Sequence, residues 1–244
     1  MNIKQLLEDE RRKRDTKYEL SIDKPDPLMV AKRYNDEYIS LICAMFSYGR
    51  VGFIVKFLNS LEFELLNKSD DTIRKSLKNH YYRFQNSEDI IALFIAIKRL
   101  KNKFNLNQLF LQEFQKEQDI FKSIQYLITI IYQHTTYRSR GFSFLIGKNN
   151  STTSPYKRWN MFLRWMIRCD SLDMGLWSGI DKKHLLVPLD THLFDIANKL
   201  KLINHKQADQ KAVISLTKKL RSFDQNDPIK YDFAIYRLGQ EGLI

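Results

Sequence analysis

The sequence predicts an all-α protein, and three observations lead to this prediction. Apolar side chains recur at helical spacing along most of the chain, no stretch of useful length alternates as a strand would, and no internal repeat or low-complexity linker interrupts the pattern. With 244 residues and 43% hydrophobic content, the chain can fill one large core or two lobes that share a cleft. We expect about ten helices.

The first half of the chain is expected to form charged and apolar helices. Pro25 and Pro27 should break the pattern after the first helix, and Asn35 should cap the second. The expected helices cover residues 1–16, 35–49 and 52–66, a short polar stretch after 69, and residues 87–100 and 119–132.

The second half opens with the longest stretch that lacks periodicity. Residues 133–153 contain YRSRGFSFLIGKNNSTT and should form an irregular, basic and aromatic connection, of a length that is often functional. Its side chains are candidates for contacts with a ligand or nucleic acid, among them Tyr137, Arg138, Arg140, Phe144 and Lys148. Further helices are expected from residue 154 and over residues 193–202, 208–220 and 227–238.

The charge of the chain favours a polyanionic partner. Forty Lys and Arg residues against 28 Asp and Glu residues leave a formal charge of +12. Charge alone does not choose between DNA, RNA and an acidic protein, and a solvated lysine-rich surface would give the same balance.

Composition also bears on where the protein is located in the cell and on whether it binds a metal or another cofactor. No apolar run reaches the length of a membrane span and the N-terminal segment is charged, so we expect a cytoplasmic protein without membrane contact. Cys43 and Cys169 each lie in an apolar helical pattern, which predicts buried reduced thiols instead of a disulfide. Neither the cysteines nor the five histidines have the spacing of metal ligands, and no metal or other cofactor is expected.

Lys157 is the first candidate for chemistry. Ser154 and Pro155 resemble an N-cap followed by a proline at the first helical position, which places Lys157 in the first turn of a helix. That helix is apolar on most sides, so the lysine should lie where a core helix meets solvent. The helix N-terminus, partial desolvation and neighbouring Arg158 would all favour the neutral amine, which is a nucleophile able to form a Schiff base. The alternative is a lysine that only binds phosphate or extends into solvent.

Asp190 is the second candidate. In VPLDTHLF it is well placed to cap the following helix, and capping alone would explain an aspartate there. A carboxylate held on a rigid turn after Pro188 could also stabilise positive charge on a sugar. His192 is expected at the helix start or behind the site, not as a general base. Together with Arg158 it is a further candidate for contacts with a ligand or nucleic acid.

These residues carry a resemblance to a known superfamily. Lys157 followed by FLR at residues 162–164, and then PLDTH at 188–192, resembles the active-site region of the helix-hairpin-helix DNA glycosylases, especially 8-oxoguanine glycosylase/lyases. More closely still, SPYKRWNMFLRWMIR, DMGLW, PLDTH and DPIKYDFAIYRLG resemble the uncharacterised bacterial DUF2400 family, within the same superfamily. The detailed family resemblance covers most of the chain, whereas the resemblance to proven glycosylases covers about residues 140–205.

The resemblance implies a fold and a reaction. The fold would have two helical lobes with a cleft between them, residues 1–36 plus 188–244 carrying Asp190 and residues 37–187 carrying Lys157. Lys157 would be the Schiff-base nucleophile and Asp190 the catalytic carboxylate of a DNA repair enzyme that flips out an oxidised base, displaces it and nicks the strand by β-elimination. The partner would be double-stranded DNA containing a damaged base, bound by a monomer associated with the nucleoid.

Two departures from the superfamily pattern bear on this hypothesis. The glycine-rich hairpin before the lysine is missing, and Gly141, Gly147 and NNSTT stand in its place. The insert between Lys157 and Asp190 is longer than usual and contains Trp177, which would stack on a flipped base or belong to the core. A non-catalytic helical nucleic-acid-binding protein of the same fold is the alternative to the enzyme.

Overall fold

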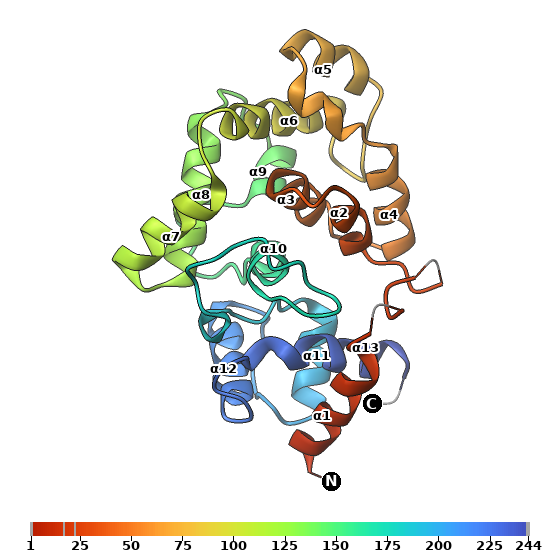
Figure 1. Cartoon of the computed structure of the whole chain (residues 1–244), viewed down its shortest axis with the longest axis vertical. Coiled ribbons are helices and arrows are strands. Elements are labelled where there is room, and N and C mark those ends of the chain that lie inside the picture. The colour runs from red at the N-terminus through yellow and green to blue at the C-terminus, as the bar shows by residue number, and fades with distance from the viewer. Residues whose placement is uncertain (1, 17, 22, 243–244) are drawn as a thin grey trace. The chain divides into compact units, whose positions relative to one another are not determined.

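The computed structural model describes residues 2–16, 18–21 and 23–242. Over these residues the chain forms thirteen α-helices, three short 3₁₀-helices and two isolated β-bridges, without a named strand (Figure 1). The predicted all-α class is therefore confirmed.

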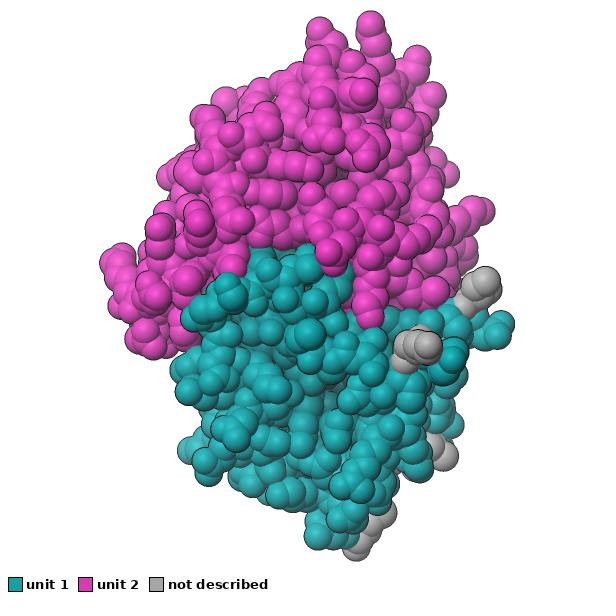
Figure 2. Space-filling model, in the orientation of Figure 1, with its two compact units in different colours: residues 1–24, 151–244 teal, residues 25–150 magenta. Residues whose placement is uncertain are grey.

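The chain divides into two compact units (Figure 2). Unit 1 comprises residues 1–24 and 151–244, and unit 2 comprises residues 25–150. The expected lobes had their boundaries after residue 36 and after residue 187, whereas the two units meet after residues 24 and 150. Lys157 and Asp190 therefore belong to the same unit. One physical reason is that the helix starting at Lys157 is bound to the C-terminal segment by buried ion pairs, which its sequence pattern does not reveal.

Unit 2 is organised around its most apolar helix, α6. This helix begins with a capping box in which Asn86 and Asp89 exchange hydrogen bonds, and ten of its fifteen residues are buried. It contacts α3, α5, α8 and α9. The elements of unit 2 are α2 (Pro27–Tyr34), α3 (Glu37–Met45), α4 (Val51–Ser60), η1 (Phe63–Asn67), α5 (Asp70–Leu77), α6 (Ser87–Lys101), α7 (Leu106–Glu117), α8 (Ile120–Gln133) and α9 (Arg140–Ile146).

Three local expectations in unit 2 are wrong. The first helix ends before Pro25 as expected, but Pro27 starts α2, a helix that was not predicted, because Asp26 caps it and a proline is tolerated at the first helical position. Asn35 is the left-handed C-cap of α2, with φ of 49°, and Asp36 caps α3. The stretch 133–153 is not wholly irregular, since it contains α9.

Unit 1 joins the N-terminal helix to the C-terminal half of the chain. Glu8 on α1 accepts hydrogen bonds from Lys230 at 2.8 Å and from Tyr231 at 2.5 Å. Burial raises the pKa of Glu8, but these bonds outweigh it and hold the pKa at about 2. The elements of unit 1 are α1 (Ile3–Arg14), α10 (Lys157–Ile167), η2 (Lys182–His184), α11 (Thr191–Lys199), α12 (Gln210–Arg221), η3 (Pro228–Tyr231) and α13 (Asp232–Gln240).

The two cysteines differ in their surroundings. Cys43 is buried in α3, as predicted, whereas Cys169 is exposed, so the prediction of a buried thiol is wrong there. The reason is that α10 ends at Ile167, and the chain then turns back through Gly175, at φ of +62°, against Cys169. Among the described residues, no group of acidic, histidine and cysteine side chains has the arrangement of a metal site. The helices there are too short or too polar to cross a bilayer.

Candidate active site

Lys157 is the first residue of α10. The helix begins two residues later than the proline pattern suggested, because Tyr156 takes a left-handed conformation with φ of 45° and ψ of 41° and becomes the N-cap. Ser154 therefore does not cap α10, although the prediction that Lys157 lies in the first turn is confirmed. The side chain of Tyr156 makes no capping bond, and Lys157 is half-buried. Lys157 thus lies at the positive end of a helix dipole, next to first-turn amides that the N-cap side chain does not neutralise.

Hydrogen bonds within unit 1 hold the segment that leads into Lys157. Asn160, one turn into α10 and 1% exposed, donates from Nδ2 to the carbonyl of Pro155 at 3.0 Å. Gln210 donates from Nε2 to the carbonyl of Ser151 and from its backbone amide to that of Thr153, both at 3.1 Å. These bonds hold the backbone that precedes Lys157 against α10 and α12.

Serine side chains accept hydrogen bonds from backbone amides at the end of the NNSTT run and just after it. The backbone amides of Thr153 and Ser154 bond to Ser151 Oγ, and the amide of Tyr156 bonds to Ser154 Oγ. These serine turns stabilise the backbone that leads into Lys157.

Asp190 is the N-cap of α11, as the sequence predicted. Its Oδ1 accepts a hydrogen bond from the amide of Leu193 at 2.8 Å, and its side chain is half-buried. Its Oδ2 makes no hydrogen bond with the described residues. One oxygen of the carboxylate therefore holds the helix while the other remains available to a ligand.

Helix α12 binds the segments that precede both candidate residues. Thr217, 1% exposed, accepts a hydrogen bond at Oγ1 from the amide of Val187 at 3.1 Å, three residues before Asp190. Gln210, which holds the segment before Lys157, lies seven residues earlier on the same helix, so the two anchors are two turns, or about 10 Å, apart along its axis. The sequence did not single out Gln210 or Thr217, although Thr217 stands out as a polar residue within the apolar face of α12.

Three further candidate residues belong to unit 1 and lie on α10, on α11 or in the segment between these two helices. Arg158 is half-buried at the second position of α10. Trp177 is 5% exposed and packs edge-on against Phe162, with ring centroids 5.2 Å apart, which favours the core alternative. His192 packs against Tyr236 of α13, and its Nε2 is buried without a hydrogen-bond partner among the described residues.

The remaining candidates lie in unit 2. Arg138 donates to the carbonyls of Tyr132, Thr135 and Tyr137, so its guanidinium closes the end of α8 instead of pointing freely at a ligand. Arg140 is exposed at the start of α9, and Phe144 is 41% exposed on the same helix. Lys148 is exposed just after it.

Arg164, the arginine of the FLR triplet, belongs to a buried ion network. It donates to Asp173 at 3.1 Å and to Asp232 at 2.5 Å, and Arg168 binds Asp227 at 3.0 Å and also reaches Asp173. Burial raises the pKa of Asp173 to about 6 in spite of the two guanidinium groups. Such a network contributes little net stability but is expensive to break, because any removed member leaves a buried charge without its partner.

Replacing Arg164 by alanine is therefore expected to lower the free energy of unfolding by about 3–5 kcal/mol, since Asp173 and Asp232 lose their shared cation. Urea denaturation followed by circular dichroism measures the change. Arg11→Ala is the control: its ion pairs with Glu8 and Asp15 are 3.2–3.3 Å long and partly exposed, and we expect a loss below about 1 kcal/mol. Equal midpoints for both variants would contradict the structural role of Arg164.

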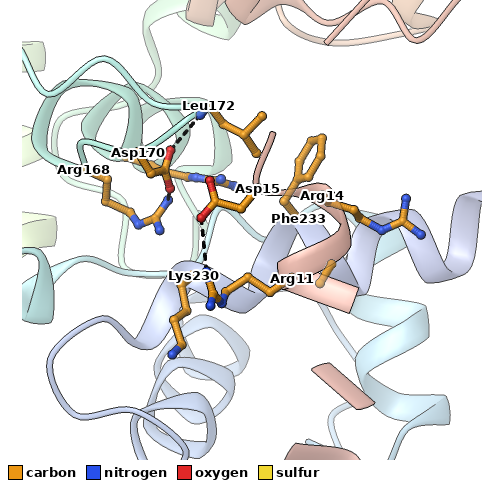
Figure 3. Close-up of a pocket in the computed structure, with 10 residues that line it drawn as sticks. Arg11, Arg14, Asp15, Arg168, Asp170, Leu172, Lys230 and Phe233 are labelled. Carbon is orange, nitrogen blue, oxygen red and sulfur yellow. Dashed lines mark hydrogen bonds and ion pairs between the residues drawn. The ribbon is translucent and has the colours of Figure 1, made fainter. Parts of the chain in front are cut away.

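A small pocket opens beside this network (Figure 3). Its volume of about 20 Å³ has room for little more than a water molecule. Five basic and two acidic side chains line it, but every basic one already pairs with carboxylates. Neither Lys157 nor Asp190 is among its lining residues. The pocket is the solvent-facing side of the ion network and not the predicted site.

Comparison with known proteins places the chain in a family. A family model described as a protein of unknown function (DUF2400) matches residues 26–241. No curated protein matches the chain. No solved structure matches it either.

Proposed function

The chain belongs to the DUF2400 family, and we propose that it is a bifunctional DNA glycosylase/AP lyase. Its substrate is double-stranded DNA that contains an oxidised base, with 8-oxoguanine as the first candidate. The proposal includes the two-lobed helix-hairpin-helix glycosylase arrangement and an association with the nucleoid.

The reaction requires one amine and one carboxylate. The neutral amine of Lys157 attacks C1′ of the flipped nucleotide, and the bond from C1′ to the base breaks as the base leaves with the electron pair and takes up a proton. One proton moves from the attacking nitrogen to O4′ as the bond from C1′ to O4′ breaks, which opens the sugar ring and gives a protonated Schiff base. Removal of a proton from C2′ then expels the 3′ phosphate, which nicks the strand. Asp190 stabilises the positive charge that develops on the sugar.

One observation carries the proposal: α12 holds both the segment before Lys157 and the segment before Asp190. Gln210 and Thr217 make these bonds from two turns of a single helix. A catalytic pair has to be held in a fixed relation, and the attachment of both preceding segments to one rigid element supports the pairing of Lys157 with Asp190. The unshared oxygen of Asp190 and the position of Lys157 at a helix N-terminus suit their proposed roles.

The alternative is a non-catalytic helical nucleic-acid-binding protein. The capping bond of Asp190 favours it, because a helix cap alone would account for the aspartate.

Borohydride trapping distinguishes the enzyme from the non-catalytic binding protein. We expect the protein to form a covalent adduct with duplexes that carry 8-oxoguanine or an abasic site when borohydride is present, and to form none with undamaged duplex. Failure to trap an adduct on any lesion would favour the binding protein.

A further inference from the structure

Unit 2 carries an aromatic surface that the proposed reaction does not use. Three rings form it: Tyr48 after α3, Phe84 in the turn before α6, and Phe144 on α9 (Figure 1 shows these helices). Their ring centroids are 4.9 Å apart for Tyr48 and Phe144, 4.7 Å for Phe84 and Phe144, and 5.8 Å for Tyr48 and Phe84. Phe84 is 55% exposed and Phe144 is 41% exposed. Large apolar rings gathered at the surface and left this accessible indicate an interaction site.

Buried bonds hold the three parts of the surface together. Tyr82, 5% exposed, donates its hydroxyl to the carbonyl of Tyr48 at 2.6 Å. Gln85, 1% exposed, donates to the carbonyl of Gly141 on α9 at 3.3 Å. The backbone segments that carry the rings are therefore held in place before a ligand binds, which reduces the entropy lost on binding.

Three arginines accompany the rings. Arg83 places its guanidinium 5.7 Å from the centre of the Tyr48 ring, Arg50 follows Tyr48 by two residues, and Arg140 lies one turn before Phe144. All three are exposed, and none forms an ion pair with a described residue.

The backbone brings Arg83 against Tyr48 at some conformational cost. Arg83 has φ of +58°, which is unusual for a residue with a side chain, and a Cβ on Gly49 would lie only 2.4 Å from the Arg83 guanidinium. Gly49 thus leaves the space that lets this arginine lie beside the rings. Asp89, at the start of α6, is 2% exposed and accepts a hydrogen bond from Tyr137 at 3.1 Å, and the neighbouring Glu88 is exposed and pairs with Arg74 at 3.4 Å. Neither carboxylate forms an ion pair with the three arginines.

We propose that this aromatic surface binds single-stranded nucleic acid by stacking unpaired bases on Phe84 and Phe144, while the three arginines contact the phosphates. Exposed aromatic rings next to arginines that form no ion pair are the combination that such binding needs, because each base offers a π-face and each nucleotide a negative charge. An apolar protein partner would use the rings but would leave the arginines without a role. The proposal concerns binding alone and stands whether or not Lys157 is a nucleophile.

The test measures binding of the full chain to an oligothymidylate that contains one 2-aminopurine. The wild-type protein should change the fluorescence of 2-aminopurine as the base stacks on a ring. We expect Phe84→Ala and Phe144→Ala each to weaken the affinity about tenfold. Phe104→Ala, at a ring of similar exposure (37%) in the same unit, is the matched control and should bind like the wild type.

Two further measurements keep the outcome decisive. The variant Phe84→Leu with Phe144→Leu retains apolar surface without flat rings, and we expect it to bind single strands as weakly as the alanine variants. Arg83→Gln should reduce the slope of log affinity against log salt concentration by about one, the change expected for the loss of one phosphate contact. Unchanged single-strand affinity in the leucine variant, with its helical content intact by circular dichroism, would overturn the proposal and leave the surface to a protein partner.

Discussion

Replacement of Lys157 by alanine is expected to abolish covalent trapping and to slow strand nicking by about a thousandfold or more. The reason is that the amine supplies the only bond between enzyme and sugar in the proposed reaction, and no step of the lyase chemistry proceeds without it. Nicking of a duplex with an abasic site, followed on denaturing gels under single-turnover conditions, measures the loss. Binding to the same duplex should change little, since the lysine is one cation among the 40 Lys and Arg residues of the chain.

Lys211→Ala is the matched control for this variant. Lys211 is an exposed lysine on α12, in the same unit, and no ion pair with a described residue involves it. We expect it to trap and nick like the wild type. If Lys157→Ala still formed the adduct at the wild-type rate, another amine would be the nucleophile.

Asp190→Asn should slow base release by about a thousandfold while leaving DNA binding and folding nearly unchanged. Asparagine caps a helix as well as aspartate does, so the bond to Leu193 can persist, whereas the negative charge that stabilises the sugar cation is lost. Single-turnover excision of 8-oxoguanine measures the rate, and thermal unfolding checks the cap.

Asp209→Asn provides an equivalent change at a different helix. Asp209 caps α12 in the same way, by accepting a hydrogen bond from Ala212 at 2.9 Å. We expect this variant to match the wild type in both stability and excision. Equal excision rates for Asp190→Asn and the wild type would reduce Asp190 to a helix cap.

Much of the secondary structure could be predicted because its signals are local. The apolar periodicity of α6, α8 and α12 is clear in the sequence, and Asp190 is recognisable as a cap from its position before an apolar run. The errors are local as well. A proline such as Pro27 is compatible with either the start or the interruption of a helix, and an asparagine such as Asn35 with either an N-cap or a C-cap. Only the backbone conformation distinguishes these roles.

The arrangement of the candidate site could not be predicted in the same way. Gln210 and Thr217 bind residues that lie 59 and 30 positions earlier in the chain. These bonds depend on tertiary contacts, which no helical period encodes. The role of Arg164 was hidden for the same reason, since its partner Asp232 lies 68 residues later in the chain. The start of α10 shifted because the left-handed turn at Tyr156 is closed by a side chain inside the helix, that of Asn160.

Lys157 is the proposed nucleophile, and identifying the residue that carries the borohydride-reduced adduct tests this assignment. The wild-type protein would be trapped on a duplex with an abasic site, digested with protease and nuclease, and sequenced by mass spectrometry to find the residue that carries the reduced sugar. We predict the sugar remnant on Lys157, at the first position of α10. A remnant on any other lysine or on the N-terminal amine would contradict this account.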